Sequence, residues 1–153
     1  MTDNIDLFVT NYNKNFTGVS ATTANVLRKQ AQTYNLRLVG CSLPECPIPV
    51  SRATAYSFAR TKPRNKPFSI WHVRRNNEMR DAIIARDMLR LPIKIVFTSA
   101  AQRRHSLVPR WLISKMDTVI ATTELAASYV PNLGAIIPHG VNTQKFKPSN
   151  NLI

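Results

Sequence analysis

Short apolar runs alternate with amphipathic segments along most of the chain. The runs are rich in β-branched and aromatic residues, as buried strands are; they lie at residues 5–12, 36–43, 68–74, 93–100, 117–123 and 135–140. Helical spacing of apolar residues predicts helices behind Gly18, from Asn76 to just before Pro92, over 106–116 and over 124–130. This alternation predicts an α/β fold, a Rossmann-like doubly wound parallel sheet of about six strands.

Four details of the pattern are specific enough to test. The first helix is predicted from the spacing of Thr23, Leu27, Ala31 and Tyr34, with Ser20 as its cap. The helix that starts at capping asparagines is expected to bury Ile84, Ala85, Met88 and Leu89. Residues 51–67 are expected to form a loop with a short helical or extended piece. Trp71 and Trp111 are both predicted in the core, with stacking on a sugar or base as the alternative.

Length and composition favour one folded domain. The 153 residues are 44% hydrophobic, enough for a real core in a domain of this size. No apolar run approaches the ~18 residues of a membrane span and the first residues do not resemble a signal peptide, so the cytoplasm is the expected compartment. Cys41 and Cys46 have no second cysteine pair and no nearby histidine, which argues against a zinc site or a disulfide framework.

Positive charge is concentrated in one region. The chain carries a net charge of +13, and residues 60–115 hold fourteen basic side chains against only Glu78, Asp81 and Asp87. A solvated basic surface is one interpretation. The others are binding of nucleic acid, an anionic membrane face or a phosphorylated substrate, and charge alone does not choose among them.

Polar and cationic residues follow the predicted strands. Gly18 lies in a loop before a helix, where backbone N–H groups bind a phosphate in many α/β proteins, although a structural turn is the alternative. The third strand is followed by His72, Arg74, Arg75 and Glu78, and the fourth by Arg103, Arg104, His105 and Arg110. Because the carboxyl ends of parallel strands share one edge, these residues predict an anion-binding cleft. The alternative for the cluster after the third strand is that its arginines are surface charges and that His72 is a half-buried ring with its hydrogen bonds satisfied.

Several enzyme classes lack support. The chain has no G-x-x-x-x-G-K-[ST] phosphate loop, no G-x-S-x-G elbow and no H-E-x-x-H motif. A kinase or a hydrolase of these types is therefore not expected.

Four ordered segments together resemble a known enzyme family. They are FTGVSAT, WHVRRNNEM, the stretch from IVFTSAAQRRH to ELAASYV, and IIPHGVNTQKFKP. In this order and spacing they resemble the N-terminal half of GT-B glycosyltransferases, in particular family 4-like retaining enzymes of the lipopolysaccharide core mannosyltransferase type. The resemblance implies an acceptor-side domain over 1–141, the start of an interdomain linker over 142–153, and a donor-binding C-terminal domain that this chain lacks.

The resemblance also implies roles for individual residues. Gly18 matches the loop that approaches the donor diphosphate, and His105 matches a histidine close to the transferred sugar. Acceptor binding is expected of His72, Arg74, Arg75, Glu78, Arg103 and Arg110. His139 and Gly140 match the crossing between the domains, although His139 stands where asparagine is common.

The implied activity is hexose transfer, with mannose from GDP-mannose as the expected sugar and donor and with retention of anomeric configuration. The acceptor would be the phosphorylated lipopolysaccharide core or lipid A, with peripheral contact to an anionic membrane at the inner face of the inner membrane. No metal, other cofactor or nucleic acid is expected, and the isolated chain is expected to be inactive. A basic nucleic-acid-binding module and a non-catalytic partner of a second chain are the alternatives.

Overall fold

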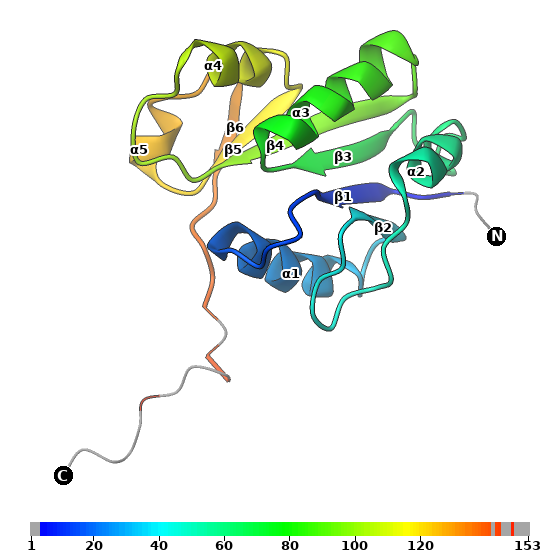
Figure 1. Ribbon diagram of the computed structural model, residues 1–153, viewed down its shortest axis with the longest axis horizontal. Helices are drawn as coiled ribbons and strands as arrows, with labels where there is room; N and C mark the ends of the chain where they lie inside the picture. The colour runs from blue at the N-terminus through cyan, green and yellow to red at the C-terminus, as the bar shows by residue number, and fades with distance from the viewer. Residues whose placement is uncertain (1–3, 142, 145–147, 149–153) are drawn as a thin grey trace.

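The computed structural model describes residues 4–141, 143, 144 and 148 and consists of a parallel sheet with helices on both sides (Figure 1). The strands are β1 (Leu7–Asn11), β2 (Leu36–Gly40), β3 (Ser69–Val73), β4 (Ile93–Ser99), β5 (Thr118–Ala121) and β6 (Leu133–Ile136). The helices are α1 (Gly18–Gln30), α2 (Arg52–Ala59), α3 (Asn76–Ile83) with its π-helical continuation η1 (Ile84–Met88), α4 (Leu107–Ser114) and α5 (Glu124–Ala127).

The strand order explains where a ligand would bind. The strands follow one another as β2-β1-β3-β4-β5-β6, and every neighbouring pair is parallel. The predicted α/β class and the six-stranded parallel sheet are confirmed. The order reverses between β1 and β3, because the chain leaves β1 toward one edge of the sheet and returns through α2 to the other side. In open α/β sheets, ligands bind beside the carboxyl ends of the strands at this reversal.

Two apolar clusters hold the layers together. On one face, residues of α2, α3 and α4 pack on the sheet around Phe8 and Trp71, whose rings stack with centroids 5.0 Å apart. On the other face, α1 places Ala24 and Leu27 against β1 and β2. Figure 1 shows α1 on one side of the sheet and α2 and α3 on the other.

The apolar runs predict strands that are buried on both faces, as in other parallel sheets, but burial is not equal along this sheet. Every residue of β1 is buried, whereas β4 alternates, with Lys94 exposed and Val96 and Thr98 only partly buried. The physical reason is that α1 covers the β1–β2 end of its face only.

Two predicted helix caps need correction. Thr17, not Ser20, caps α1, since its hydroxyl accepts a hydrogen bond from the Ser20 N–H. The N-cap of α3 is Arg75, which has no side-chain cap bond, and the asparagines lie inside the helix.

Two further segments test the predicted bounds of the elements. The last strand was expected over 135–140, but β6 begins two residues earlier, at Leu133, and ends at Ile136, before the proline. The short helical piece expected within 51–67 is confirmed as α2.

The buried face of the third helix also differs from the prediction. Met79, Ala82 and Ala85 are buried, but Ile84, Met88 and Leu89 are among the exposed apolar residues. The physical reason is the π-helical turn of η1, in which the Leu89 N–H donates to the Ile84 carbonyl, five residues earlier, at 3.0 Å. Each turn there contains more residues than an α-helical turn, so the residues that follow are rotated relative to the core. A 3.6-residue period therefore stops predicting the inward face at that point.

The two tryptophans have different environments. Trp71 is fully buried, as predicted, but the prediction that Trp111 lies in the core is wrong, because more than half of its surface is exposed. Leu112 and Ile113 form the inner face of α4 and leave Trp111 on the outer one. Within the described part of the chain, no helix is long and apolar enough to cross a bilayer.

Candidate functional site

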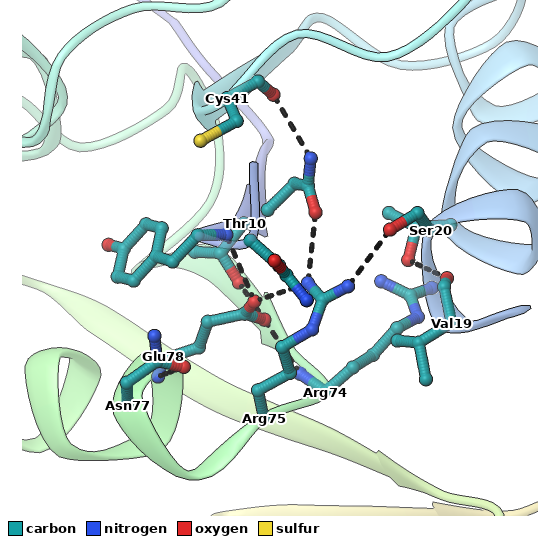
Figure 2. A network of polar contacts seen from close by, with 12 residues as sticks. Thr10, Val19, Ser20, Cys41, Arg74, Arg75, Asn77 and Glu78 are labelled. Carbon is teal, nitrogen blue, oxygen red and sulfur yellow. Dashed lines mark hydrogen bonds and ion pairs between the residues drawn. The ribbon is translucent and has the colours of Figure 1, made fainter. Parts of the chain in front are cut away.

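The site lies where β1 and β3 end and α1 begins, at the reversal of strand order. Thr10 and Asn11 close β1, Arg74 and Arg75 follow β3, and Ser20 lies in the first turn of α1. Figure 2 shows Thr10 and Ser20 beside the Arg75 guanidinium and the Glu78 carboxylate, with the side chain of Arg74 lying apart from them. Segments far apart in the sequence thus meet in one polar network.

Glu78 is the centre of that network. Its side chain is fully buried, and its Oε1 accepts from the Thr10 hydroxyl at 2.7 Å and from the Arg74 N–H at 3.0 Å. Its Oε2 accepts from the Tyr12 N–H at 3.2 Å and from Arg75 Nη1 at 2.9 Å. A buried carboxylate is stable only when paired and hydrogen-bonded, and Glu78 meets both conditions.

Arg75 connects three elements through one guanidinium. Besides the ion pair with Glu78, Nη1 donates to Asn11 Oδ1 at 2.9 Å, and Nη2 donates to Ser20 Oγ at 3.0 Å. Asn11 in turn donates from Nδ2 to the Cys41 carbonyl at 3.2 Å, behind β2. Arg75 and Glu78 therefore fix the geometry of the site from inside it.

Arg74 differs from its neighbour because its charge is not paired. Its Nε and Nη1 are buried and have no hydrogen-bond partner among the described residues. Burial and then Arg75 lower the pKa of Arg74 to about 10, against the opposing effect of Glu78. Figure 2 shows its side chain extending alongside the first turn of α1 near Val19. A buried, unsatisfied cation is costly unless a ligand supplies the missing acceptors.

The start of α1 offers further anion-binding groups. The first turn contains no acidic residue, and its free N–H groups carry the positive end of the helix dipole. A Cβ added at Gly18 would meet no atom within 4 Å, so space is open beside the backbone there. Gly18, the first residue of α1, and the side chain of Arg74, which follows β3, thus lie at the same end of the helix.

A second carboxylate, one turn after Glu78, braces the same helix. Asp81 accepts hydrogen bonds from the hydroxyls of Tyr12 and Tyr56, and Arg52 lies 3.5 Å away. Burial, followed by the hydrogen bond to Asp81, raises the pKa of both tyrosines above the usual value. These contacts fix the loop after β1 and helix α2 to α3.

His72 is held inside the sheet rather than at an open surface. The ring is buried and its Nε2 lies 2.7 Å from Thr98 Oγ1 on the neighbouring strand. Burial, and after it the charge of Arg74, lowers the pKa of His72 well below its ordinary value. The neutral ring is therefore the form that the fold favours.

This burial predicts a pH-dependent stability. Between the pKa values of His72 in the unfolded and folded chain, the unfolded state binds more protons, so stability is complete above about pH 6.5 and declines as the pH falls. As the pH falls from 7.5 to 5, this histidine is expected to lower the free energy of unfolding by up to about 1.4 kcal/mol for each pH unit below 6.5.

Urea unfolding of the chain and of His72→Gln at several pH values checks this prediction. The variant should show a clearly flatter profile, with a small remaining slope from His105, whose pKa burial also lowers. His139→Gln, at an exposed histidine, is the matched control and should keep the original profile. Identical profiles for His72→Gln and the original chain would contradict the prediction.

The second predicted cluster lies behind β4. Arg103 and His105 line one surface pocket, and Arg110 lines another together with Trp111. His105 is partly exposed, but its Nε2 is buried and has no partner among the described atoms. The structure brings Gly18, Arg74, Arg75 and Glu78 together at one place along the carboxyl edge, and Arg103 and His105 at another.

The remaining predicted positions follow β6. His139 and Gly140 are exposed and lie beyond the end of the strand, at the same carboxyl edge. Most of the predicted linker, residues 142–153, falls outside the described residues. Nothing in the described geometry joins His139 and Gly140 to the two clusters.

Sequence reasoning missed several polar residues of the network. Thr10, Asn11 and Ser20 are buried and bind Glu78 or Arg75, yet they were not among the candidates. A signal was present, because a threonine and an asparagine end an otherwise apolar strand at the position where ligands bind in α/β sheets.

Comparison with known proteins gives this geometry a context. No protein-family model matches the chain. Over 145 residues it is 36% identical to a protein of Rhizobium meliloti (strain 1021) named lipopolysaccharide core biosynthesis mannosyltransferase LpsB. Over the same length it is 34% identical to the protein of Rhizobium leguminosarum bv. viciae named lipopolysaccharide core biosynthesis mannosyltransferase LpcC.

The matches cover nearly all of this chain but less than half of each relative. Each takes in 94% of this chain but 41% of the relative, so the chain spans about two fifths of the length of the curated relatives it matches. The assignment to GT-B enzymes of family 4 stays a prediction. The predicted resemblance to mannosyltransferases of the lipopolysaccharide core is confirmed: over nearly all of its length, the chain is similar to enzymes of that name.

Proposed function

We propose that the chain is the acceptor-side domain of a mannosyltransferase that acts in assembly of the lipopolysaccharide core. The proposed donor is GDP-mannose, the acceptor is the phosphorylated core or lipid A, and the anomeric configuration is retained. The observation that carries the proposal is Arg74, whose Nε and Nη1 are buried without a hydrogen-bond partner among the described residues, beside the open start of α1, in a chain similar to two proteins named as such mannosyltransferases.

The chemistry of sugar transfer explains why this site is needed. Negative charge grows on the nucleoside diphosphate as the bond to the sugar breaks, so fixed cationic and N–H groups stabilise the transition state. In this proposal, the N-terminus of α1 at Gly18 and the Arg74 guanidinium receive the diphosphate. Arg75 and Glu78 hold Arg74 and α1 in place through their buried network.

The second cluster has a separate role in the proposal. His105 lies near the transferred sugar, and Arg103 and Arg110 bind anionic groups of the acceptor, whereas His72, which is buried inside the sheet, is not given the acceptor-binding role that was expected of it. His139 and Gly140 lead toward a second domain, which provides the remaining donor contacts. Transfer therefore requires both domains, and the 153 residues alone are expected to be inactive.

Deletion of the coding sequence in the source cell tests the proposed function. Mass spectrometry of the lipopolysaccharide core should then show a product that is shorter by at least the hexose in question, and the intact coding sequence should restore it. In vitro, the protein as the cell makes it should transfer mannose from GDP-mannose to the shortened core. An unchanged core after deletion would rule the proposal out.

Gly18→Ala gives a residue-level prediction. Because a Cβ at this position meets open space, the variant should fold with unchanged stability. The methyl group would stand where the diphosphate approaches the backbone, so the KM for the donor should rise about tenfold, the equivalent of one charge-assisted hydrogen bond.

Steady-state kinetics of the protein from its source cell measure this effect. Gln32→Ala, an exposed substitution behind the other end of α1, is the matched control and should leave KM unchanged. An unaltered KM in Gly18→Ala would show that the N-terminus of α1 is not part of the donor site. The proposed function would still be tested separately by the deletion experiment.

A further inference from the structure

One face of the sheet is covered by a helix at one end only. Leu7 and Val9 of β1 pack against α1 on this face, and Ile70 and His72 are their partners in register on β3. Among the described residues, the apolar cluster on this face comes from α1, β1, β2 and the segment after β2, and includes none from β4, β5 or β6. Helices α2, α3 and α4 pack on the opposite face (Figure 1). The face that β4, β5 and β6 present on the α1 side is therefore without a helix in the described part of the chain.

The strand pairing shows which residues form this uncovered area. Partners in register on neighbouring parallel strands point to the same side of the sheet. Three rows of partners cross the area: Ile70–Lys94, His72–Val96–Thr118 and Thr98–Ile120–Ala135. His72 is buried, but Ile70 and Lys94 are exposed and the others are only partly buried. We call these residues, without His72, the open sheet face.

The open sheet face has the composition of a buried surface. Apart from Lys94, it consists of aliphatic side chains and threonines, which are typical of covered strands. Sheets in which all strands are parallel occur almost only where both faces are covered. A partner is therefore expected on this face.

The charge of the molecule favours a second copy of the chain as that partner. With a net charge of +13, two copies repel each other wherever basic surfaces meet. On the open sheet face only Lys94 is charged, and its Nζ lies 3.6 Å from Asp117 Oδ1. The exposed apolar residues of α4 are less suited to such a contact, because Arg104, Arg110 and Lys115 flank them. Two copies can thus meet with little repulsion at the open sheet face.

We propose that two copies of the chain associate through their open sheet faces, related by a twofold axis. A twofold contact uses the same surface on both copies, so this surface must be complementary to itself. A face with aliphatic side chains and one balanced charge meets that condition. Two sheets that pack face to face lie about 10 Å apart and interdigitate their side chains. Ile70, Val96 and Ile120 provide the apolar part of the contact.

This association is separate from the proposed sugar transfer. Gly18, Arg74 and Arg75 lie at the carboxyl edge of the sheet rather than on the open sheet face. The contact between two copies therefore needs neither donor nor acceptor, and it can be measured on the chain alone.

Sedimentation equilibrium and light scattering of the chain over a range of concentrations test the proposal. The expected result is a reversible equilibrium between monomer and dimer. The dimer should become tighter as the salt concentration rises from about 0.05 M to about 0.5 M, because salt screens the repulsion between two basic chains and leaves apolar contacts in place. Binding of an anionic partner would show the opposite salt dependence.

Substitutions locate the contact on the open sheet face. Ile70→Lys with Thr118→Lys adds two cations to each copy and should weaken the dimer at least about tenfold. Ile48→Lys with Met88→Lys adds the same charge at exposed apolar residues elsewhere and should change its dissociation constant by less than about threefold. Circular dichroism checks that each variant is folded. Ile70→Ala, which adds no charge, should weaken the dimer about threefold and keeps the test valid if the lysine variant does not fold.

Three results would overturn the proposal. A monomer at every concentration up to about 1 mM, the weak end of measurable affinities, would leave the open sheet face to a helix of another protein or domain. A dimer that survives both substitutions at Ile70 would place the contact elsewhere. A dimer that dissociates as salt rises would be held by ion pairs rather than by this face. None of these outcomes affects the deletion experiment on the lipopolysaccharide core.

Discussion

Replacement of Glu78 by alanine is expected to lower the free energy of unfolding by about 3–5 kcal/mol, the usual cost of breaking a buried ion pair. The variant leaves the Arg75 guanidinium without its carboxylate in a mostly buried position. It also removes the acceptor of the Thr10 hydroxyl and of the backbone N–H groups of Tyr12 and Arg74. The loss should exceed that of an apolar truncation of equal size, because four donors are affected.

Urea denaturation followed by circular dichroism measures this loss. Glu124→Ala, at an exposed glutamate, is the control and should change stability by less than about 0.5 kcal/mol. The double variant with Arg75→Ala should be less destabilised than the sum of the single variants, since removal of both charges leaves neither one unpaired. A loss below about 1 kcal/mol for Glu78→Ala would show that water replaces the carboxylate.

The fold was predictable because its strongest signal is local. Each strand is a short apolar run between polar turns. When such runs alternate with helical segments, few assignments other than a buried strand remain. β6 was the least accurate strand, because its two middle residues are Gly134 and Ala135, which carry little hydrophobic signal. The inward face of α3 and η1 was missed because a π-helical turn has no signature in the spacing of apolar residues.

The sequence predicted where the candidate site lies, but not which of its arginines is bound internally and which is left without a partner. Parallel strands bring their carboxyl ends to one edge, so Arg74, Arg75 and Glu78 were expected close together. The sequence does not reveal that Arg75 is bound internally by Asn11 and Ser20 while Arg74 remains unpaired. That difference depends on long-range contacts, across 64 residues for Asn11 and 55 for Ser20, which no local pattern encodes.

The exposed Trp111 shows how a wrong prediction becomes informative. A core position was expected because a large aromatic side chain is more often buried than exposed. In the structure, Leu112 and Ile113 form the inner face of α4 and leave Trp111 on the outer one. The residue type thus predicted burial, but which side of the helix faces the core depends on its packing against the sheet.

Gly40→Ala is the second substitution with a large expected effect, a loss of about 2–4 kcal/mol in the free energy of unfolding. Gly40 ends β2 with φ +106°, a conformation that residues with a Cβ rarely adopt. A Cβ there would lie 2.5 Å from the Asn11 carbonyl oxygen and 2.8 Å from Tyr12 Cδ1. The backbone of β1 or β2 must therefore move.

That movement should reach the candidate site, because Asn11 holds Arg75 through its side chain and Cys41 through its carbonyl. The matched control is Gly140→Ala, where a Cβ meets no atom within 4 Å and stability should remain within about 0.5 kcal/mol. Urea denaturation gives the stability of both variants, and amide exchange at Asn11 and Cys41 shows whether the strand ends separate. If Gly40→Ala matched Gly140→Ala in both measurements, the close approach of β2 to Asn11 would not constrain the site, and the hydrogen bond between Asn11 and Arg75 would not depend on it.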